Sequence, residues 1–127
     1  MGRGTFQGSC HCGAIRFEID AEIDHVRSCD CSICSKRGAL IFRVPEADFR
    51  LLTPSDSAFI YRWGSMTGAD HICRTCGIMP FRRPGHPSRE ERERGIEPFH
   101  GWGINTRCLD DFDPEGVPVR KIAGSAI

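Results

Sequence analysis

Eight cysteines are the residues of this sequence best suited to chemistry, and seven of them lie in three tight clusters. The clusters are Cys10-His11-Cys12, Cys29-Asp30-Cys31-Ser32-Ile33-Cys34 and Cys73-Arg74-Thr75-Cys76. Cysteines this close along a chain are poor disulfide partners, because the short connection strains the bond. They are good ligands for one metal ion, because a tight turn can aim two sulfurs at it. The spacing therefore predicts metal binding, with Zn²⁺ as the expected ion.

The seven clustered cysteines divide most simply into a set of four and a set of three. The set of four combines the first and third clusters: Cys10, Cys12, Cys73 and Cys76. The set of three is the middle cluster: Cys29, Cys31 and Cys34. Four thiolates close a structural zinc site, whereas three protein ligands leave the open position of a catalytic site. We therefore expect two zinc ions per chain, one structural and one catalytic.

Other assignments of the second site stay open at the level of sequence. Cys108 or a histidine such as His25 could complete it, and both zinc ions would then be structural in a non-enzymatic scaffold or interaction module. Iron–sulfur ligation is another use of clustered cysteines. A labile second zinc, lost when its thiolates are oxidised, would instead indicate redox or metal sensing.

An open site of three thiolates has a limited chemistry, because its three negative charges outweigh the two positive charges of zinc. Such an ion is a weak Lewis acid and makes hydroxide poorly near neutral pH. It can still bind a soft sulfur and favour its deprotonation. The cluster therefore favours chemistry on a small thiol over hydrolysis.

Short strands separated by Gly and Pro turns must position these clusters. The expected strands are 5–9, 14–19, 26–29, 39–44, 58–63, 71–73, 80–82, 100–105 and 118–122. The first two form a hairpin with Cys10 at its tip, because hydrophobic and polar residues alternate along 15–20. Residues 31–37 predict a short helix with Ser32 as N-cap and Gly38 as its end. The pattern predicts a mainly β domain.

The charged stretch 83–98 interrupts this pattern. Ser88 and Glu91 have the spacing of a capping box, and Arg89 with Glu93 has the i,i+4 spacing of a helical ion pair. We expect a short, charged surface helix within a loop. It is either a solvated insertion or a lid over the substrate.

The length and the charge balance limit the function classes. A chain of 127 residues is one ordinary domain. Seventeen basic residues balance seventeen acidic ones, so no overall field attracts nucleic acid or a membrane surface. No apolar run is long enough to span a bilayer, and the first twenty residues lack the apolar core of a signal peptide. We therefore expect a cytoplasmic protein whose thiols stay reduced.

Four segments resemble the glutathione-dependent formaldehyde-activating enzyme (GFA) family, also called the centromere protein V/GFA family. They are 8–17 (GSCHCGAIRF), 29–34 (CDCSIC), 73–77 (CRTCG) and the softer match 105–110 (NTRCLD). The resemblance runs from about residue 5 to residue 112, within a single domain of residues 1–127. This chain departs from the expected family pattern between Arg82 and Phe99, where the charged stretch lies.

The resemblance implies an Mss4-like fold of small coiled β-sheets. It implies the same division of cysteines, with a structural zinc on Cys10, Cys12, Cys73 and Cys76 and a catalytic zinc on Cys29, Cys31 and Cys34. The implied activity is that of a carbon–sulfur lyase, S-(hydroxymethyl)glutathione synthase, which joins formaldehyde to glutathione. The implied partner is therefore a small-molecule thiol. The oligomeric state is not implied.

Overall fold

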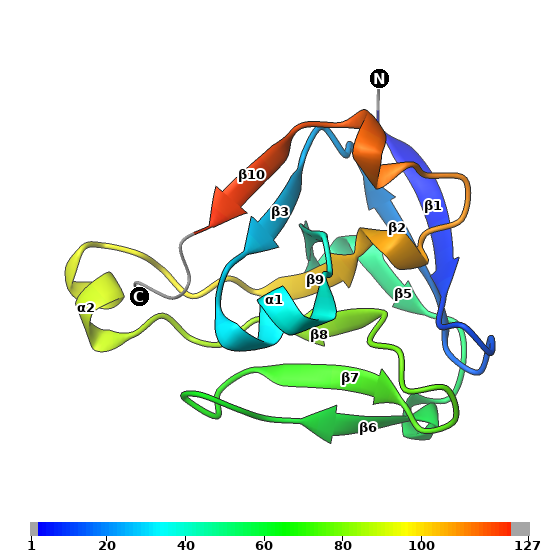
Figure 1. The fold of residues 1–127 in the computed structure, drawn as a ribbon, viewed down its shortest axis with the longest axis horizontal. Helices are drawn as coiled ribbons and strands as arrows, with labels where there is room; N and C mark the ends of the chain where they lie inside the picture. Colours follow the sequence, from blue (N-terminus) through cyan, green and yellow to red (C-terminus); the bar gives the residue numbers. More distant parts are fainter. Residues whose placement is uncertain (1–2, 123–127) are drawn as a thin grey trace.

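The structure is a computed structural model that describes residues 3–122. Ten strands form two sheets, with two short helices beside them (Figure 1). The three-stranded sheet has the order β1 (Gly4–Ser9), β2 (Arg16–Ala21) and β5 (Phe49–Leu51). The seven-stranded sheet has the order β10 (Val119–Ile122), β3 (Val26–Cys29), β4 (Ile41–Pro45), β9 (Gly101–Asn105), β8 (Phe81–Arg83), β7 (Ala69–Cys73) and β6 (Ala58–Tyr61). The mainly β, Mss4-like expectation is confirmed.

The N-terminal hairpin forms as the alternating pattern predicts. β1 and β2 pair antiparallel over their full lengths, from Gly4 opposite Ala21 to Ser9 opposite Arg16. Phe17 and Ile19 are buried, and the residues between them face outward. Gly8 is required for space, because a Cβ there would collide with the Phe17 ring and the backbone of the 106–108 turn. The hairpin places Cys10 at its buried tip.

The core lies between the two sheets and combines aliphatic side chains with a cluster of aromatic rings. Phe17 and Phe49 of the smaller sheet meet Phe81 and Trp102 of the larger one, with ring centroids 4.6–5.5 Å apart. Aromatic packing of this kind supplies much of the energy that holds two small sheets together. It also defines an inner face and an outer face of the seven-stranded sheet.

Helix α1 (Ser32–Arg37) is tied to the outer face through Asp70, a fully buried residue of β7. Arg37 at the end of α1 donates to one Asp70 oxygen at 2.6 Å, and Arg82 of β8 donates to the other at 2.6 Å. The Trp63 indole N–H donates to the same carboxylate at 2.7 Å. A buried carboxylate needs such partners, and here they fix α1 against β7 and β8.

Sequence and structure differ at a few local positions. The N-cap of α1 is Cys31, so the prediction of Ser32 is wrong, whereas Gly38 ends the helix in the left-handed conformation as predicted. Strand β5 was not predicted, because its three residues carry too short a pattern. Of the predicted strand 39–44, only Val44 of β4 is fully buried.

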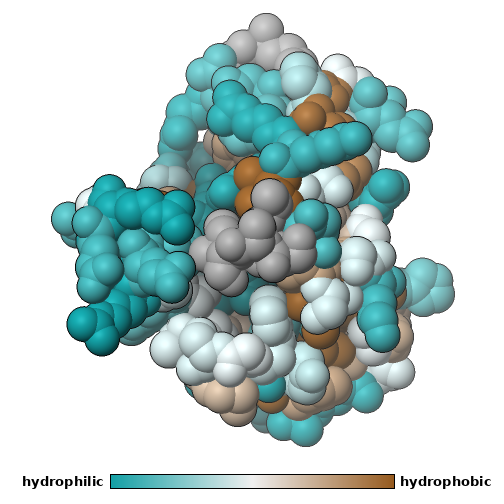
Figure 2. Space-filling view, turned by 60° about the vertical axis from the view of Figure 1, so that its left-hand side comes forward, coloured by the Kyte–Doolittle hydropathy of each residue, from teal (hydrophilic) through white to brown (hydrophobic). Residues whose placement is uncertain are grey.

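The charged segment 83–98 contains α2 (Arg89–Glu93), which begins with the predicted capping box between Ser88 and Glu91. The Arg89–Glu93 ion pair also forms, at 3.2 Å. The segment projects at the left of Figure 1, and Figure 2 shows a hydrophilic lobe on that side of the molecule. The described residues 3–122 contain no helix long and apolar enough to cross a membrane.

We predict that Asp70→Asn lowers the free energy of unfolding by about 3 kcal/mol, because it leaves two largely buried arginines without their counter-charge. Urea denaturation at pH 7 measures this loss. Asp56→Asn, at an exposed aspartate, is the matched control and should change stability by less than about 0.5 kcal/mol. Equal losses in the two variants would contradict the role given to Asp70.

We also predict that the stability difference between the wild type and Asp70→Asn depends on pH. Burial alone raises the pKa of Asp70, but the hydrogen bonds from Arg82 and Arg37 outweigh it, so its pKa is lowered on folding. A lowered pKa contributes stability above the unfolded-state value, about 3.9, and that stability is lost as the pH falls through the folded value. The advantage of the wild type over Asp70→Asn should therefore be constant near neutral pH and shrink in acid.

Candidate metal centres

The first and third cysteine clusters converge on one point, as predicted. The Sγ atoms of Cys10, Cys12, Cys73 and Cys76 all lie within 4.8 Å of one another. Cys12 Sγ is 3.7 Å from Cys10 Sγ and 3.6 Å from Cys73 Sγ. A tetrahedron of sulfurs around zinc, with bonds of about 2.3 Å, has edges of about 3.8 Å. The spacing of the four-cysteine cluster therefore suits a zinc ion, and none of its cysteines is in a disulfide.

Two tight turns hold these sulfurs in place. Gly13 and Gly77 follow the two clusters with φ angles of 83° and 80°, a conformation that costs other residues energy. The turns direct backbone N–H groups at sulfur: Ile15 donates to Cys10 Sγ at 3.3 Å, and Cys76 donates to Cys73 Sγ at 3.4 Å. The N–H of Cys76 is the main cause of the lowered pKa of Cys73. These donors favour thiolates, the form that binds metal.

The middle cluster also comes together. Cys29 ends β3, Cys31 is the N-cap of α1 and Cys34 lies within the helix, and their Sγ atoms are all within 4.8 Å of one another. Burial raises the pKa of Cys31, but the backbone N–H groups at the start of α1 outweigh it and lower the pKa. Burial raises the pKa of Cys34 to about 12. The start of α1 therefore favours ionisation of Cys31 over that of Cys34.

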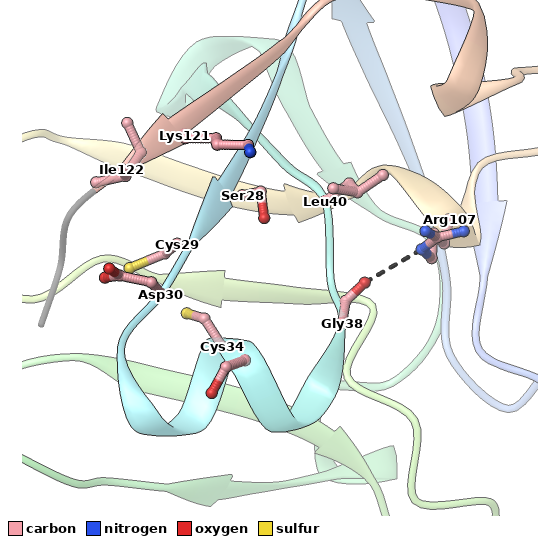
Figure 3. A pocket seen from close by; sticks show the side chains of 10 residues that line it. Ser28, Cys29, Asp30, Cys34, Gly38, Leu40, Arg107, Lys121 and Ile122 are labelled. Carbon is pink, nitrogen blue, oxygen red and sulfur yellow. Dashed lines mark hydrogen bonds between the residues drawn. The ribbon is translucent and has the colours of Figure 1, made fainter.

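A pocket of about 530 Å³ opens beside the three-cysteine cluster, between β3, β10 and α1. Figure 3 shows the sulfurs of Cys29 and Cys34 directed into the same space, with Asp30 beside Cys29. Lys121 of β10 and Arg107 add positive charge to the wall. Arg107 is oriented by a hydrogen bond from its Nε to the Gly38 carbonyl oxygen, 3.2 Å long (Figure 3). The three-cysteine cluster thus faces an accessible cavity with cationic walls.

The two candidates for a fourth ligand do not join this cluster. His25 binds the Asp24 carboxylate at 2.6 Å through Nδ1 and packs its ring against Phe42. Burial raises the pKa of the Cys108 thiol to about 12, with smaller contributions from Cys10 and Cys76. Cys108 therefore lies toward the four-cysteine cluster. Among residues 3–122, both groups of potential ligands consist of cysteines alone.

Several other residues singled out in the sequence have structural partners. His71 packs between Phe81 and Trp102, and burial lowers its pKa. Arg37 and Arg82 bind Asp70, as described above. Arg83 pairs with Glu46 and lies 3.8 Å from the Trp102 ring centroid. The charges of these arginines are therefore used in contacts that stabilise the fold.

Sequence reasoning missed Lys121 as a pocket residue. It reaches the site because β10 pairs parallel to β3, with Lys121 opposite Ser28. A pairing between segments about ninety positions apart leaves no local signal in the sequence. Arg107 carried a weak signal, since it lies in the softest of the four segments of family resemblance.

We predict that Gly77→Ala destabilises the protein by about 1–2 kcal/mol and weakens zinc binding, because alanine is strained at this φ and shifts the sulfur-directed turn. Gly116→Ala is the matched control, because Gly116 has no positive φ and its Cβ would meet nothing closer than 3.9 Å. Thermal unfolding and competition with a zinc chelator measure the two effects. Equal behaviour of both variants would show that the turn is not strained.

Comparison with known proteins agrees with these centres. A protein of Rhodobacter sphaeroides with a known crystal structure is similar, with 29% sequence identity and a TM-score of 0.71. The match covers 90% of this chain and 99% of that one. The family model described as glutathione-dependent formaldehyde-activating enzyme (GFA) matches residues 5–97, about three quarters of the chain. The chain therefore belongs to the GFA family, which confirms the resemblance carried by the cysteine segments.

Proposed function

We propose that this protein is a two-zinc enzyme that forms a carbon–sulfur bond between formaldehyde and a small thiol, glutathione in the family's named reaction. One observation carries the proposal: the three-cysteine cluster faces a pocket of about 530 Å³. The four-cysteine cluster, in contrast, supplies a full tetrahedral set. The two clusters thus differ in the way that catalytic and structural zinc sites differ.

The division of roles follows from the ligand sets. Cys10, Cys12, Cys73 and Cys76 would hold a structural zinc, and Cys29, Cys31 and Cys34 would hold a catalytic one. When bound at the second cluster, zinc supplies a position for a soft sulfur and lowers the pKa of that thiol. The free state of all eight cysteines fits a reducing cytoplasm, which we propose as the location. We also propose that residues 1–127 form a single domain.

The pocket residues would bind and orient the thiol. Glutathione carries carboxylates, and the Lys121 ammonium and Arg107 guanidinium in the wall attract them. This contact would place the sulfur beside Cys29 and Cys34, where proximity to formaldehyde lowers the barrier to addition. The sulfur adds to the carbonyl carbon, the carbonyl electron pair moves to oxygen, and the proton lost by the thiol is returned to that oxygen. The product is a hemithioacetal, with all atoms conserved.

We predict that zinc analysis distinguishes the two clusters. The wild type should contain two zinc ions per chain, and Cys76→Ser and Cys31→Ser should each lose one. Cys76→Ser should lower the free energy of unfolding by about 3 kcal/mol or more, because this zinc joins distant segments and its binding energy stabilises the fold. Cys31→Ser should cost less, since its cluster spans only 29–34.

Elemental analysis of purified protein and thermal unfolding measure these effects. Cys108→Ser is the matched control, because it removes a thiol from neither cluster. It should keep both zinc ions. A wild type with a single zinc, or equal destabilisation by Cys31→Ser and Cys76→Ser, would contradict the assigned roles.

We predict that zinc-loaded wild type accelerates the exchange between glutathione and its formaldehyde adduct, and that Cys31→Ser loses at least about 100-fold of this acceleration. Exchange spectroscopy by NMR measures the rate at equilibrium and corrects for the uncatalysed reaction. Cys108→Ser should retain the wild-type rate. Equal rates in wild type and Cys31→Ser would rule out catalysis at this cluster and favour a zinc-binding scaffold.

A further inference from the structure

A second pocket, of about 260 Å³, lies next to the cysteine pocket and is lined by arginines. Its charged residues are Arg27 of β3, Arg43 of β4 and Arg120 of β10, with His25 at one side. Arg120 is directly opposite Arg27 in the parallel pair, and Arg27 is opposite Ile41, two residues before Arg43. Strand alternation therefore places all three arginines on one face of the sheet.

These arginines lack the ion pairs that several other arginines of the chain form; Arg27 is half-buried, and Arg43 and Arg120 are exposed. Arg37, Arg50, Arg82 and Arg83 each bind a carboxylate. Arg27, Arg43 and Arg120 form no ion pair with any of the described residues 3–122, and Arg43 lies instead over the Phe99 ring at 5.3 Å. Like charges placed opposite one another destabilise a sheet.

The acidic groups near the pocket do not balance this charge. Asp24 accepts a hydrogen bond from His25, and the charge of Arg120 makes the last and smallest contribution to lowering its pKa. Glu91 of α2 acts on Arg43 only as a weak electrostatic partner. Neither carboxylate forms an ion pair with Arg27, Arg43 or Arg120 among the described residues. A bound anion would relieve the repulsion that remains.

The arginine pocket is within reach of a molecule bound at the cysteines. Ile122 lines both pockets and is opposite Cys29, just as Arg120 is opposite Arg27. Two residues along a strand correspond to about 6.6 Å. A thiol of ordinary metabolite size can therefore place its sulfur beside Cys29 and an anionic group between Arg27 and Arg120.

We propose that the arginine pocket binds a carboxylate or phosphate group of the same molecule whose thiol enters the cysteine pocket, an inference that rests on the proposed function. The planar forks of arginine match both oxyanions through paired hydrogen bonds. Lys121 and Arg107 would bind an anionic group close to the sulfur of the thiol, and the arginine pocket would bind an anionic group farther from it. The substrate class is therefore thiols that carry an anionic group remote from sulfur, and neutral thiols are poor ligands.

Titration calorimetry on the zinc-loaded protein tests this proposal at a fixed ionic strength. The ligands are glutathione, a carboxylate thiol, and 4′-phosphopantetheine, a phosphate thiol, with inorganic phosphate as a probe of the pocket alone. The variant is Arg27→Gln combined with Arg120→Gln. Arg16→Gln is the matched control, because Arg16 is an exposed arginine on β2 of the other sheet.

The dissociation constant of at least one anionic thiol should rise tenfold or more in the double variant and stay unchanged in Arg16→Gln. The ligand that responds identifies the oxyanion as carboxylate or phosphate. Unchanged binding of both thiols, or an equal loss in Arg16→Gln, would overturn the proposal. If the arginine substitutions weaken binding while Cys31→Ser still forms the formaldehyde adduct at the wild-type rate, then the binding site is correct and only the proposed reaction is wrong.

Discussion

The convergence of Cys10 and Cys12 with Cys73 and Cys76 is the constraint on which the rest of the structure depends. The first pair lies just beyond β1 of the small sheet, and the second pair lies at the end of β7 of the large one. The two sheets share no strand, so their relative position depends on the core between them, on a bridge between Gly8 and Leu109, and on these four sulfurs. Thiolates at 3.6–3.7 Å repel one another unless a cation lies among them. A metal ion bound among these sulfurs, as proposed, would therefore also stabilise the packing of the two sheets.

A short series of contacts connects the four-cysteine cluster to the three-cysteine cluster. Cys73 and Asp70 share β7, and Asp70 binds Arg37 at the end of the helix that carries Cys34. The strand that is anchored by the four-cysteine cluster thus also orients α1 against the outer face. Asp70 does not touch the pocket. It acts by fixing the helix whose first turn directs Cys31 and Cys34 toward Cys29.

Features encoded by neighbouring residues could be predicted from the sequence. The three tight cysteine clusters, the hairpin, the end of α1 at Gly38 and the capping box at Ser88 all depend on spacings of a few residues, whereas the union of the first and third clusters followed from counting ligands. Lys121 and the pairing of Arg120 with Arg27 depend on a parallel contact between strands far apart in the chain. Asp70 was missed for a related reason, because a lone acid in a strand gives no sign that two arginines will bury it.

The composition likewise gives no sign of how charge is distributed over the molecule, because that distribution depends on contacts between distant segments. Seventeen positive and seventeen negative residues leave no net field, yet the fold divides them unevenly. Acidic side chains are used to pair Arg37, Arg50, Arg82 and Arg83. The arginines and lysine around the cysteine pocket keep much of their charge available. Three thiolates on one Zn²⁺ are net negative and would repel an anionic thiol. In the proposed function, the positive charges of Lys121 and the arginines would offset that repulsion and let an anionic thiol approach the three-cysteine cluster.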